Sequence, residues 1–160
     1  MQLSEYQTEA IKTAIYPADA KLLYPLLGLA GEAGEVLQNF TDKIDFGNNF
    51  NLKNAFTAFV EAAKNCEKVK KLIRDTKTEY IQNEVNDIKP QVDVLLQDEE
   101  FIKETGKEIG GNLWYVSAVA NDLGLSLGDI GDINIAQLKS RQERGKLNGS
   151  GSNRWSLEIF

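Results

Sequence analysis

The stretch YPLLGLAGEAGEV, from Tyr24 to Val36, contains the pattern on which the fold assignment rests. Apolar residues recur in it at helical spacing, and glycines stand three positions apart at Gly28, Gly31 and Gly34. A glycine inside a helix costs about 1 kcal/mol relative to alanine. We therefore predict a helix over about 22–40 whose glycines permit the close approach of another backbone or of a ligand.

The same helical spacing dominates the rest of the 160-residue chain, and few segments alternate as strands do. Five further helices are predicted, over about 4–15, 52–74, 79–97, 100–123 and 126–145. Capping boxes are expected to open the first of these helices at Ser4 with Gln7 and the last at Ser126 with Asp129. Pro90 is expected to interrupt the helix over 79–97, and Gly124 to end the helix over 100–123. Together these elements predict an all-α helical bundle in a single domain over residues 1–160.

Two of the predicted helices have apolar residues at positions expected to face inward. These are Phe56, Phe59, Val60, Ala63, Val69, Leu72 and Ile73 in the helix over 52–74, and Ile102, Ile109, Leu113, Val116, Val119 and Ala120 in the helix over 100–123. Cys66 is expected to be a small core residue, because free cysteines are usually buried.

The absent residue types narrow the chemistry. The chain has no histidine and one cysteine, which excludes Ser-His-Asp and Cys-His catalysis, histidine-ligated zinc or iron, and an internal disulfide. Carboxylates, lysines, arginines and hydroxyls remain. Carboxylates without imidazoles favour a hard cation, Mg²⁺ or Mn²⁺.

Charge and hydropathy narrow the partners. A net charge of −6 argues against binding a nucleic-acid polymer over the whole surface, although a local basic cluster or a metal can still hold a small anion. No stretch reaches the roughly 18 apolar residues that a membrane span needs. Residues 1–15 resemble neither a signal peptide nor a transit peptide, so the cytoplasm is the expected location.

Two groups of acidic residues are candidates for a cation site. Glu32 and Glu35 share a helix face, and Glu108 shares one with Glu104 and Asn112. The alternative is that both groups are simply solvated faces of amphipathic helices. The small residues around Glu32 and Glu35 favour a functional interpretation, because an ordinary surface pair does not require them.

The C-terminal part of the chain reverses the sign of the overall charge. Its basic residues are Lys139, Arg141, Arg144, Lys146 and Arg154. Phosphate binding is one interpretation of this segment. A flexible, solvated tail over about 145–160 is the other.

Four segments together resemble the MazG-like nucleotide pyrophosphohydrolases, a branch of the all-α NTP pyrophosphohydrolase superfamily. They are YPLLGLAGEAGEV (24–36), KKLIRD (70–75), KEIGGNLWYVSAVANDLGLSL (107–127) and N-x-x-x-L-x-x-R-x-x-R-G (134–145). The GSGSNR ending is similar to that of small single-domain members from bacteria and phages. The match covers the first and last thirds of the chain, and about 28 residues over 38–66 form an insertion relative to the short members.

The resemblance implies magnesium-dependent hydrolysis of (deoxy)nucleoside triphosphates to a nucleoside monophosphate and pyrophosphate, by a homodimer or homotetramer. It implies catalytic metal ligands at Glu32, Glu35 and Glu108. The substrate-binding residues it implies are Lys70, Arg74, Arg141 and Arg144 on the phosphates and Asn134 as a polar site residue. Trp114 either flanks the base or packs in the core, and packing is the preferred interpretation.

Three positions depart from the family pattern. Gly111 stands where an aspartate ligand is expected, Gln137 replaces a common lysine, and Ser152 replaces a frequent aspartate. An alternative function is therefore a catalytically weakened or inactive homologue that binds nucleotide or regulates. A third hypothesis is a helical interaction module that makes its contact through the phenylalanine-rich insertion.

Overall fold

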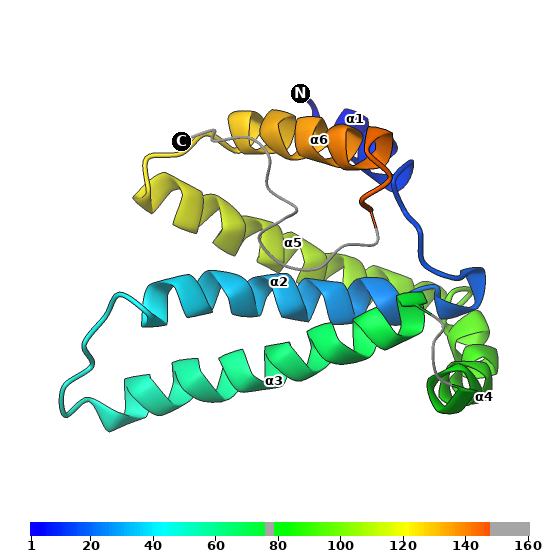
Figure 1. The fold of residues 1–160 in the computed structure, drawn as a ribbon, viewed down its shortest axis with the longest axis horizontal. Coiled ribbons are helices and arrows are strands. Elements are labelled where there is room, and N and C mark those ends of the chain that lie inside the picture. The colour runs from blue at the N-terminus through cyan, green and yellow to red at the C-terminus, as the bar shows by residue number, and fades with distance from the viewer. Residues whose placement is uncertain (76–78, 148–160) are drawn as a thin grey trace. The chain divides into compact units, whose positions relative to one another are not determined.

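The computed structural model describes residues 1–75 and 79–147 and contains only helices and connecting segments in that part of the chain (Figure 1). The α-helices are α1 (Leu3–Ile11), α2 (Leu23–Thr41), α3 (Phe50–Asp75), α4 (Glu79–Leu95), α5 (Glu99–Asp122) and α6 (Leu127–Glu143), with a short 3-10 turn, η1, at Ala18–Ala20. The all-α fold class expected from the sequence is thus confirmed. None of the helices described is long and apolar enough to cross a membrane.

The helices group into two compact units. The middle unit, residues 16–93, contains η1, α2, α3 and nearly all of α4. The terminal unit combines residues 1–15 with the described chain from Val94 onward, and contains α1, α5 and α6.

In the middle unit α2 and α3 lie side by side along most of their length (Figure 1). A Cβ atom added to Gly34 would lie 2.1 Å from the Cβ of Ala63, and one added to Gly31 would lie 2.3 Å from Oε1 of Glu67. The glycines of α2 therefore permit the close approach predicted for them, and the neighbour at both positions is α3.

The core of the middle unit lies where η1, α3 and α4 meet. Its buried residues are Ala20, Ile73, Ile81 and Val85, with Tyr24, Leu27, Val69 and Leu72 packed against them. Val60 and Ala63 are buried farther along α3, as the spacing predicts, whereas Phe59 is 42% exposed. Cys66 is only half-buried.

Local signals located several helix ends correctly. Gly124 follows α5 with φ +69°, and the Leu125 N–H donates to the Ala120 carbonyl at 2.8 Å, which satisfies a terminal carbonyl. The Ser126 hydroxyl accepts from the N–H of Asp129 at 3.3 Å and opens α6.

Two boundary predictions were wrong. The cap of the first helix is Gln2, two residues before the expected cap Ser4, because the Gln2 N–H donates to Glu5 at 2.9 Å and so pairs these residues instead of Ser4 and Gln7. The fourth helix continues through Pro90 to Leu95. A proline removes one backbone donor, and the loss is tolerated at this exposed position.

The inward face predicted for α5 was also largely wrong. Of its six expected core residues only Ala120 is buried, and the other five are 45–53% exposed. The closely packed helix pairs among the described residues are α2 with α3 and α1 with α6, so α5 has no such partner in the terminal unit. An apolar stripe identifies a face suited to burial, but the partner that covers it is decided by tertiary or quaternary contacts.

Candidate functional site

The geometry of α2 separates a packing face from an acidic face. Gly28, Gly31 and Gly34 face α3. Glu32 and Glu35 each come one position after a glycine and lie on an adjoining, exposed side of the helix. The two carboxylates are one turn apart and so share that side. Among the described residues Glu35 has no hydrogen-bond or ion-pair partner, and its carboxylate is available to a cation.

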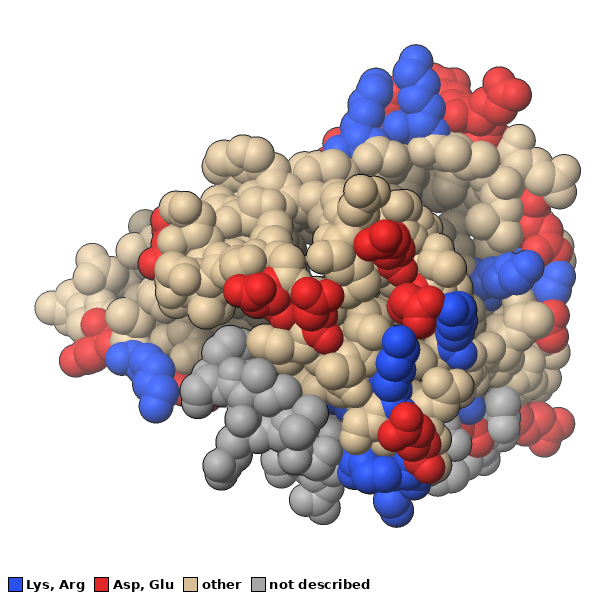
Figure 2. All heavy atoms as spheres, turned by 90° about the horizontal axis from the view of Figure 1, so that it is seen from above, with Lys and Arg blue, Asp and Glu red and all other residues tan. Residues whose placement is uncertain are grey.

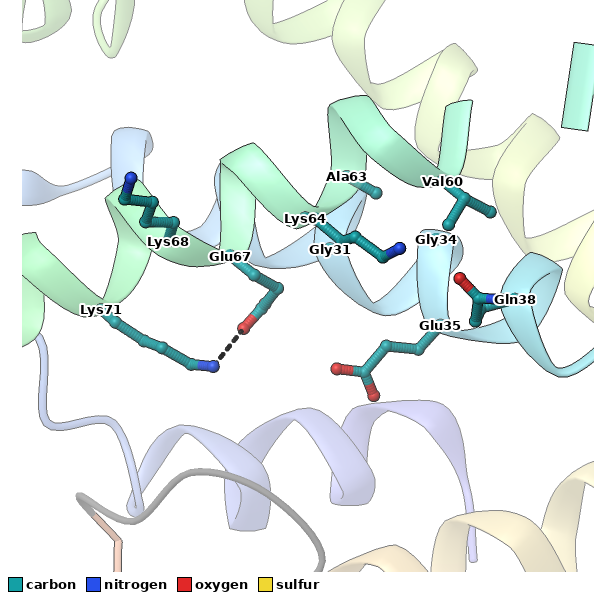
Figure 3. Close-up of a pocket in the computed structure, with 10 residues that line it drawn as sticks. All are labelled: Gly31, Gly34, Glu35, Gln38, Val60, Ala63, Lys64, Glu67, Lys68 and Lys71. Atoms are coloured by element: carbon teal, nitrogen blue, oxygen red, sulfur yellow. Dashed lines mark ion pairs between the residues drawn. The ribbon is translucent and has the colours of Figure 1, made fainter. Parts of the chain in front are cut away.

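A pocket of about 440 Å³ opens beside this acidic face, between α2 and α3 (Figure 3). Its small and apolar lining comes from Gly31, Gly34, Val60 and Ala63. Its polar lining comes from Glu35 and Gln38 of α2 and from Lys64, Glu67, Lys68 and Lys71 of α3. The missing side chains of the two glycines help to create the hollow, and long polar side chains from both helices surround it.

The ion pairs at this pocket fall into an inner and an outer set. Inside, Lys70 pairs with Glu67, and these side chains are only 8% and 13% exposed. The Lys71 ammonium reaches the other oxygen of Glu67 at 3.9 Å (Figure 3). The buried lysine therefore neutralises Glu67, and Lys71 on the outside is held only loosely.

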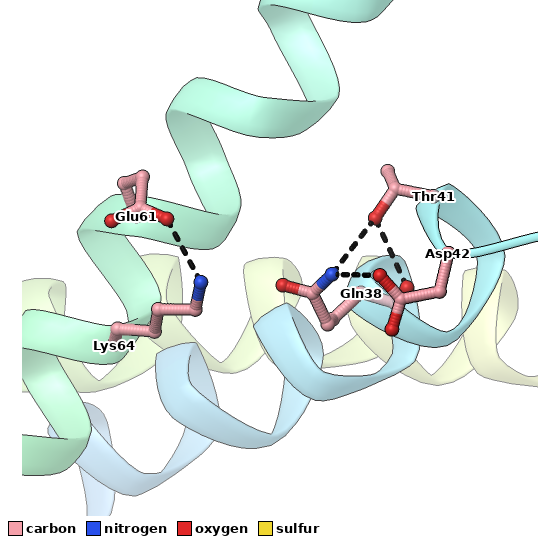
Figure 4. Close-up of polar contacts among 5 residues, drawn as sticks. All are labelled: Gln38, Thr41, Asp42, Glu61 and Lys64. Atoms are coloured by element: carbon pink, nitrogen blue, oxygen red, sulfur yellow. Dashed lines mark hydrogen bonds and ion pairs between the residues drawn. The ribbon is translucent and has the colours of Figure 1, made fainter.

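The outer end of the pocket is more open. Lys64 pairs with Glu61 at 2.8 Å while remaining 59% exposed (Figure 4). The Gln38 amide, which faces this end from α2, donates to Asp42 at 2.5 Å and to Thr41 at 3.3 Å (Figure 4). Exposed pairs of this kind contribute little stability and exchange readily with other ligands.

The structure places two expected phosphate contacts inside the middle unit. Lys70 is buried beneath Gly28 of α2 and engaged by Glu67. The Arg74 side chain is 4% exposed, and its Nε donates to Asp75 at 2.8 Å. That hydrogen bond is the main reason that the pKa of Arg74 is raised, and Tyr24 adds to the effect. Both cations thus have carboxylate partners within the fold.

Sequence reasoning missed the lysines that do line the pocket, Lys64, Lys68 and Lys71. Their spacing of four and then three residues was a readable signal, because it places them on one side of a helix. Glu67, which links two lysines to the glycine face of α2, was missed as well.

The terminal unit contains the remaining candidate ligand. Glu108 is exposed on α5, and its backbone carbonyl accepts from the Asn112 amide at 2.9 Å. Nearby Glu104 is paired with Lys107 at 2.6 Å. A Cβ atom added to Gly111 would meet no atom within 4 Å, so the position has room for the aspartate that the family pattern expects.

Trp114 does not pack in the core, which corrects the preferred interpretation of that residue. It is 64% exposed and makes an edge-to-face contact with Tyr115, with ring centroids 4.9 Å apart. The physical reason is the same as for the rest of α5, which has no closely packed helix partner among the described residues of its unit.

The candidate residues of α6 are partly engaged in packing α1. Asn134 accepts a 2.9 Å hydrogen bond from the Tyr6 hydroxyl, and burial raises the pKa of that tyrosine. Lys139 lies 3.2 Å from Glu9 of α1. Asn134 and Lys139 therefore join two helices of the terminal unit.

The other basic candidates of this segment lie toward its end. Arg141 is half-buried on α6, and the exposed Arg144 donates from Nε to the Ser140 hydroxyl and carbonyl, both at 3.2 Å. Gln137, at the position where the family has lysine, is buried in α6. Ser152 and Arg154 lie outside the described residues.

The donor set suits a hard divalent cation with few protein ligands. Magnesium is commonly held by one or two carboxylates, with water and substrate phosphates completing its shell. Glu32 and Glu35 supply such a pair in the middle unit, and Glu108 belongs to the terminal unit. No cluster of three or more Cys, Asp or Glu side chains arranged for a metal occurs in the described part of either unit.

Comparison with known proteins adds one relative. The chain is 29% identical over 160 residues to the "Gene 37 protein" of Mycobacterium phage L5, across 96% of this chain and 100% of the phage protein. No family model matches the chain. No solved structure matches it either.

Proposed function

We propose that the chain is a magnesium-dependent pyrophosphohydrolase of (deoxy)nucleoside triphosphates, as its resemblance to the MazG-like enzymes implies. Water attacks at the α-phosphate, the bond from that phosphorus to the α,β-bridging oxygen breaks, and pyrophosphate leaves. The observation that supports this reaction best is the pairing of two exposed carboxylates, Glu32 and Glu35, with the lysine-lined pocket beside them.

The residues of the chain have distinct parts in this proposal. Glu32 and Glu35 would hold Mg²⁺, or Mn²⁺ as a substitute, and the resemblance implies Glu108 as a further ligand. When bound, the cation neutralises phosphate charge and polarises the phosphoryl group. Arg141 and Arg144 remain candidates for phosphate contact, and Asn134 and Trp114 for contact with the rest of the nucleotide.

Location and partners follow from the same proposal. A triphosphate substrate places the enzyme in the cytoplasm, and the apolar face exposed on α5 supports a homodimer or homotetramer. A nucleic-acid polymer is not the proposed ligand. On the face drawn in Figure 2, acidic and basic side chains occur in mixed groups, as expected of a surface that does not track a phosphate backbone.

The second candidate function is nucleotide binding without cleavage, and Gly111 favours it. Glycine removes one expected oxygen ligand and one negative charge from the α5 face that bears Glu108. A magnesium ion bound with fewer carboxylates keeps more water and binds less tightly. Such a protein would retain the pocket and lose turnover.

One assay separates these functions. Pyrophosphate release is measured over a panel of ribo- and deoxynucleoside triphosphates with Mg²⁺ and then Mn²⁺, for the native chain and for Gly111→Asp. Release by the native chain supports the enzyme, and Glu35→Gln should then abolish it. If the native chain releases no pyrophosphate and Gly111→Asp does, nucleotide binding without cleavage is supported. If neither the native chain nor Gly111→Asp releases pyrophosphate, and neither binds nucleotide, both proposed functions are refuted.

A further inference from the structure

The α2–α3 pocket has a row of lysines on one of its walls. Lys64, Lys68 and Lys71 lie at helical spacing on α3 and line the pocket. In Figure 3 the Lys68 side chain is directed away from those of Lys64 and Lys71. The chain as a whole has a net charge of −6, so three cations along one pocket reverse the local balance. The row is too short for a polymer and suits a compact anion.

The charge on these lysines is only partly neutralised by the protein. Lys68 has no ion-pair or hydrogen-bond partner among the described residues. Lys71 is 3.9 Å from a Glu67 carboxylate that already pairs with Lys70. Lys64 pairs with Glu61 in solvent, where such a pair is weak. All three ammonium groups can therefore turn to an anionic ligand at little cost.

The pocket itself has the size and lining of a ligand site. Its volume of about 440 Å³ falls within the roughly 300–1,000 Å³ typical of small-molecule pockets. Gly31, Gly34, Val60 and Ala63 form a small-residue floor, and a Cβ at Gly34 would collide with Ala63. The floor is set by backbone packing, so the hollow does not depend on one side-chain rotamer.

Glu35 gives the pocket a second property. It is the lining carboxylate without a partner in the described structure, and it extends from α2 opposite the lysines of α3 (Figure 3). A bare polyanion would be repelled by it, whereas a polyanion carrying Mg²⁺ would be attracted. The lining is thus complementary to a magnesium-bound chain of phosphates.

We infer that the α2–α3 pocket binds a short polyphosphate chain, with Lys64, Lys68 and Lys71 contacting its oxygens and Glu35 meeting its magnesium ion. This inference rests on the proposed function for its physiological ligand, a nucleoside triphosphate. It assigns the phosphate contacts to the pocket-lining lysines of α3 in place of the buried Lys70 and Arg74. The chemistry is shared by free inorganic polyphosphate, so the test includes both ligands.

The test is calorimetric binding of inorganic tripolyphosphate to the full chain, with and without Mg²⁺. The pocket variant is Lys64→Gln, Lys68→Gln and Lys71→Gln combined. Its matched control removes the same charge from exposed lysines outside the pocket, Lys43→Gln, Lys53→Gln and Lys103→Gln. Because each charge-assisted hydrogen bond contributes strongly, we expect the pocket variant to bind at least about tenfold more weakly than the control variant.

The substitution Glu35→Gln tests independently whether Glu35 meets the magnesium ion of the bound tripolyphosphate. It should strengthen metal-free binding of tripolyphosphate, because it removes a repelling charge, and it should reduce the gain in affinity that Mg²⁺ gives the native chain. Equal losses in the pocket and control variants would overturn the inference. So would no binding by the native chain up to about 1 mM tripolyphosphate, the weak end of specific affinity.

Two further measurements separate this inference from the proposed enzyme. If a deoxynucleoside triphosphate displaces tripolyphosphate and its nucleoside does not, the nucleotide is a ligand of the pocket. If the nucleotide does not displace tripolyphosphate that is bound through these lysines, free polyphosphate is the ligand. Pyrophosphate release with an unchanged KM in the pocket variant would keep the enzyme and refute the lysine assignment. If the chain binds tripolyphosphate through these lysines but releases no pyrophosphate, the lysine assignment is supported and the proposed enzyme activity is refuted.

Discussion

At the scale of single residues, two glycines that look alike in sequence have opposite surroundings. Gly34 lies against Ala63 of α3, and Gly111 faces open space on α5. The sequence predicted that glycines inside helices have a packing or ligand reason, which is correct for Gly34. Gly111 has no close neighbour among the described residues, so its surroundings give no packing reason for it.

The substitution Gly34→Ala should destabilise the protein. The added methyl group would lie 2.1 Å from the Ala63 Cβ, and neither atom can rotate away because both are fixed to helix backbones. Separating two packed helices by overpacking costs about 1–3 kcal/mol, and the better helix propensity of alanine returns about 1 kcal/mol or less. Urea unfolding should therefore show a lower midpoint, and an unchanged or higher midpoint would contradict the close contact.

Gly111→Ala is the matched control and should have the opposite sign. No atom lies within 4 Å of its added methyl group, so only the propensity change remains. We expect the free energy of unfolding to rise by up to about 1 kcal/mol. A loss of stability at this position would show that α5 is closely covered in the folded protein.

At the scale of elements, α1 is attached to α6 by polar contacts in addition to packing. Glu9 of α1 contacts Lys139 of α6 and Lys12 of its own helix end. The hydrogen bond to Lys12, followed by that to Lys139, lowers the pKa of Glu9 from its ordinary value of 4.5. This ion network was not predicted, because Glu9 and Lys139 are distant in sequence.

The lowered pKa of Glu9 gives a pH-dependent contribution to stability of known sign. A carboxyl whose pKa is depressed in the folded state stabilises that state above its unfolded pKa, and the contribution is lost as pH falls through the folded value. Glu9→Gln should thus reduce the stability of the folded state at pH 7, and it should make that stability fall less steeply as the pH is lowered. Thermal unfolding from about pH 7 to about pH 3 measures both effects. Glu143→Gln, at an exposed position on α6, is the control and should leave the slope unchanged.

The hydrogen bond from Tyr6 to Asn134 joins the same two helices. Tyr6→Phe removes the donor and leaves the half-buried amide oxygen unpaired, which should cost about 1 kcal/mol. Asn134→Ala in the Tyr6→Phe background should then add less than it costs alone, because the shared bond is already lost. Strictly additive effects in urea unfolding would show that the bond does not contribute to holding α1 on α6.

At the scale of the whole molecule, local signals were predictable and long-range partners were not. The start of α6 at Ser126 and the end of α5 at Gly124 were predicted correctly, because capping depends on a few neighbouring residues. The burial of Lys70 and Arg74 could not be read from a motif, since it depends on Glu67 and Asp75 and on how closely α2 approaches α3. Trp114 shows the converse, an aromatic at helical spacing that is not buried.

The exposed apolar face of α5 leads to the last prediction, which concerns assembly. Ile102, Ile109, Leu113, Val116 and Val119 are each 45–53% exposed along one helix. Contiguous apolar patches on a protein surface usually mark interaction sites. We expect the chain to self-associate through this face, with an oligomer mass in light scattering that falls on dilution.

Val116→Glu should shift that equilibrium toward the monomer, because a buried unpaired carboxylate costs several kcal/mol at an apolar interface. Asn121→Glu adds the same charge five residues along, at an exposed position that helical spacing places away from Val116 and Val119, and should leave the mass unchanged. If the native chain is monomeric at every concentration, or if both variants dissociate it equally, then α5 is not the assembly surface. Retention of the native helical content by Val116→Glu would separate loss of assembly from loss of folding.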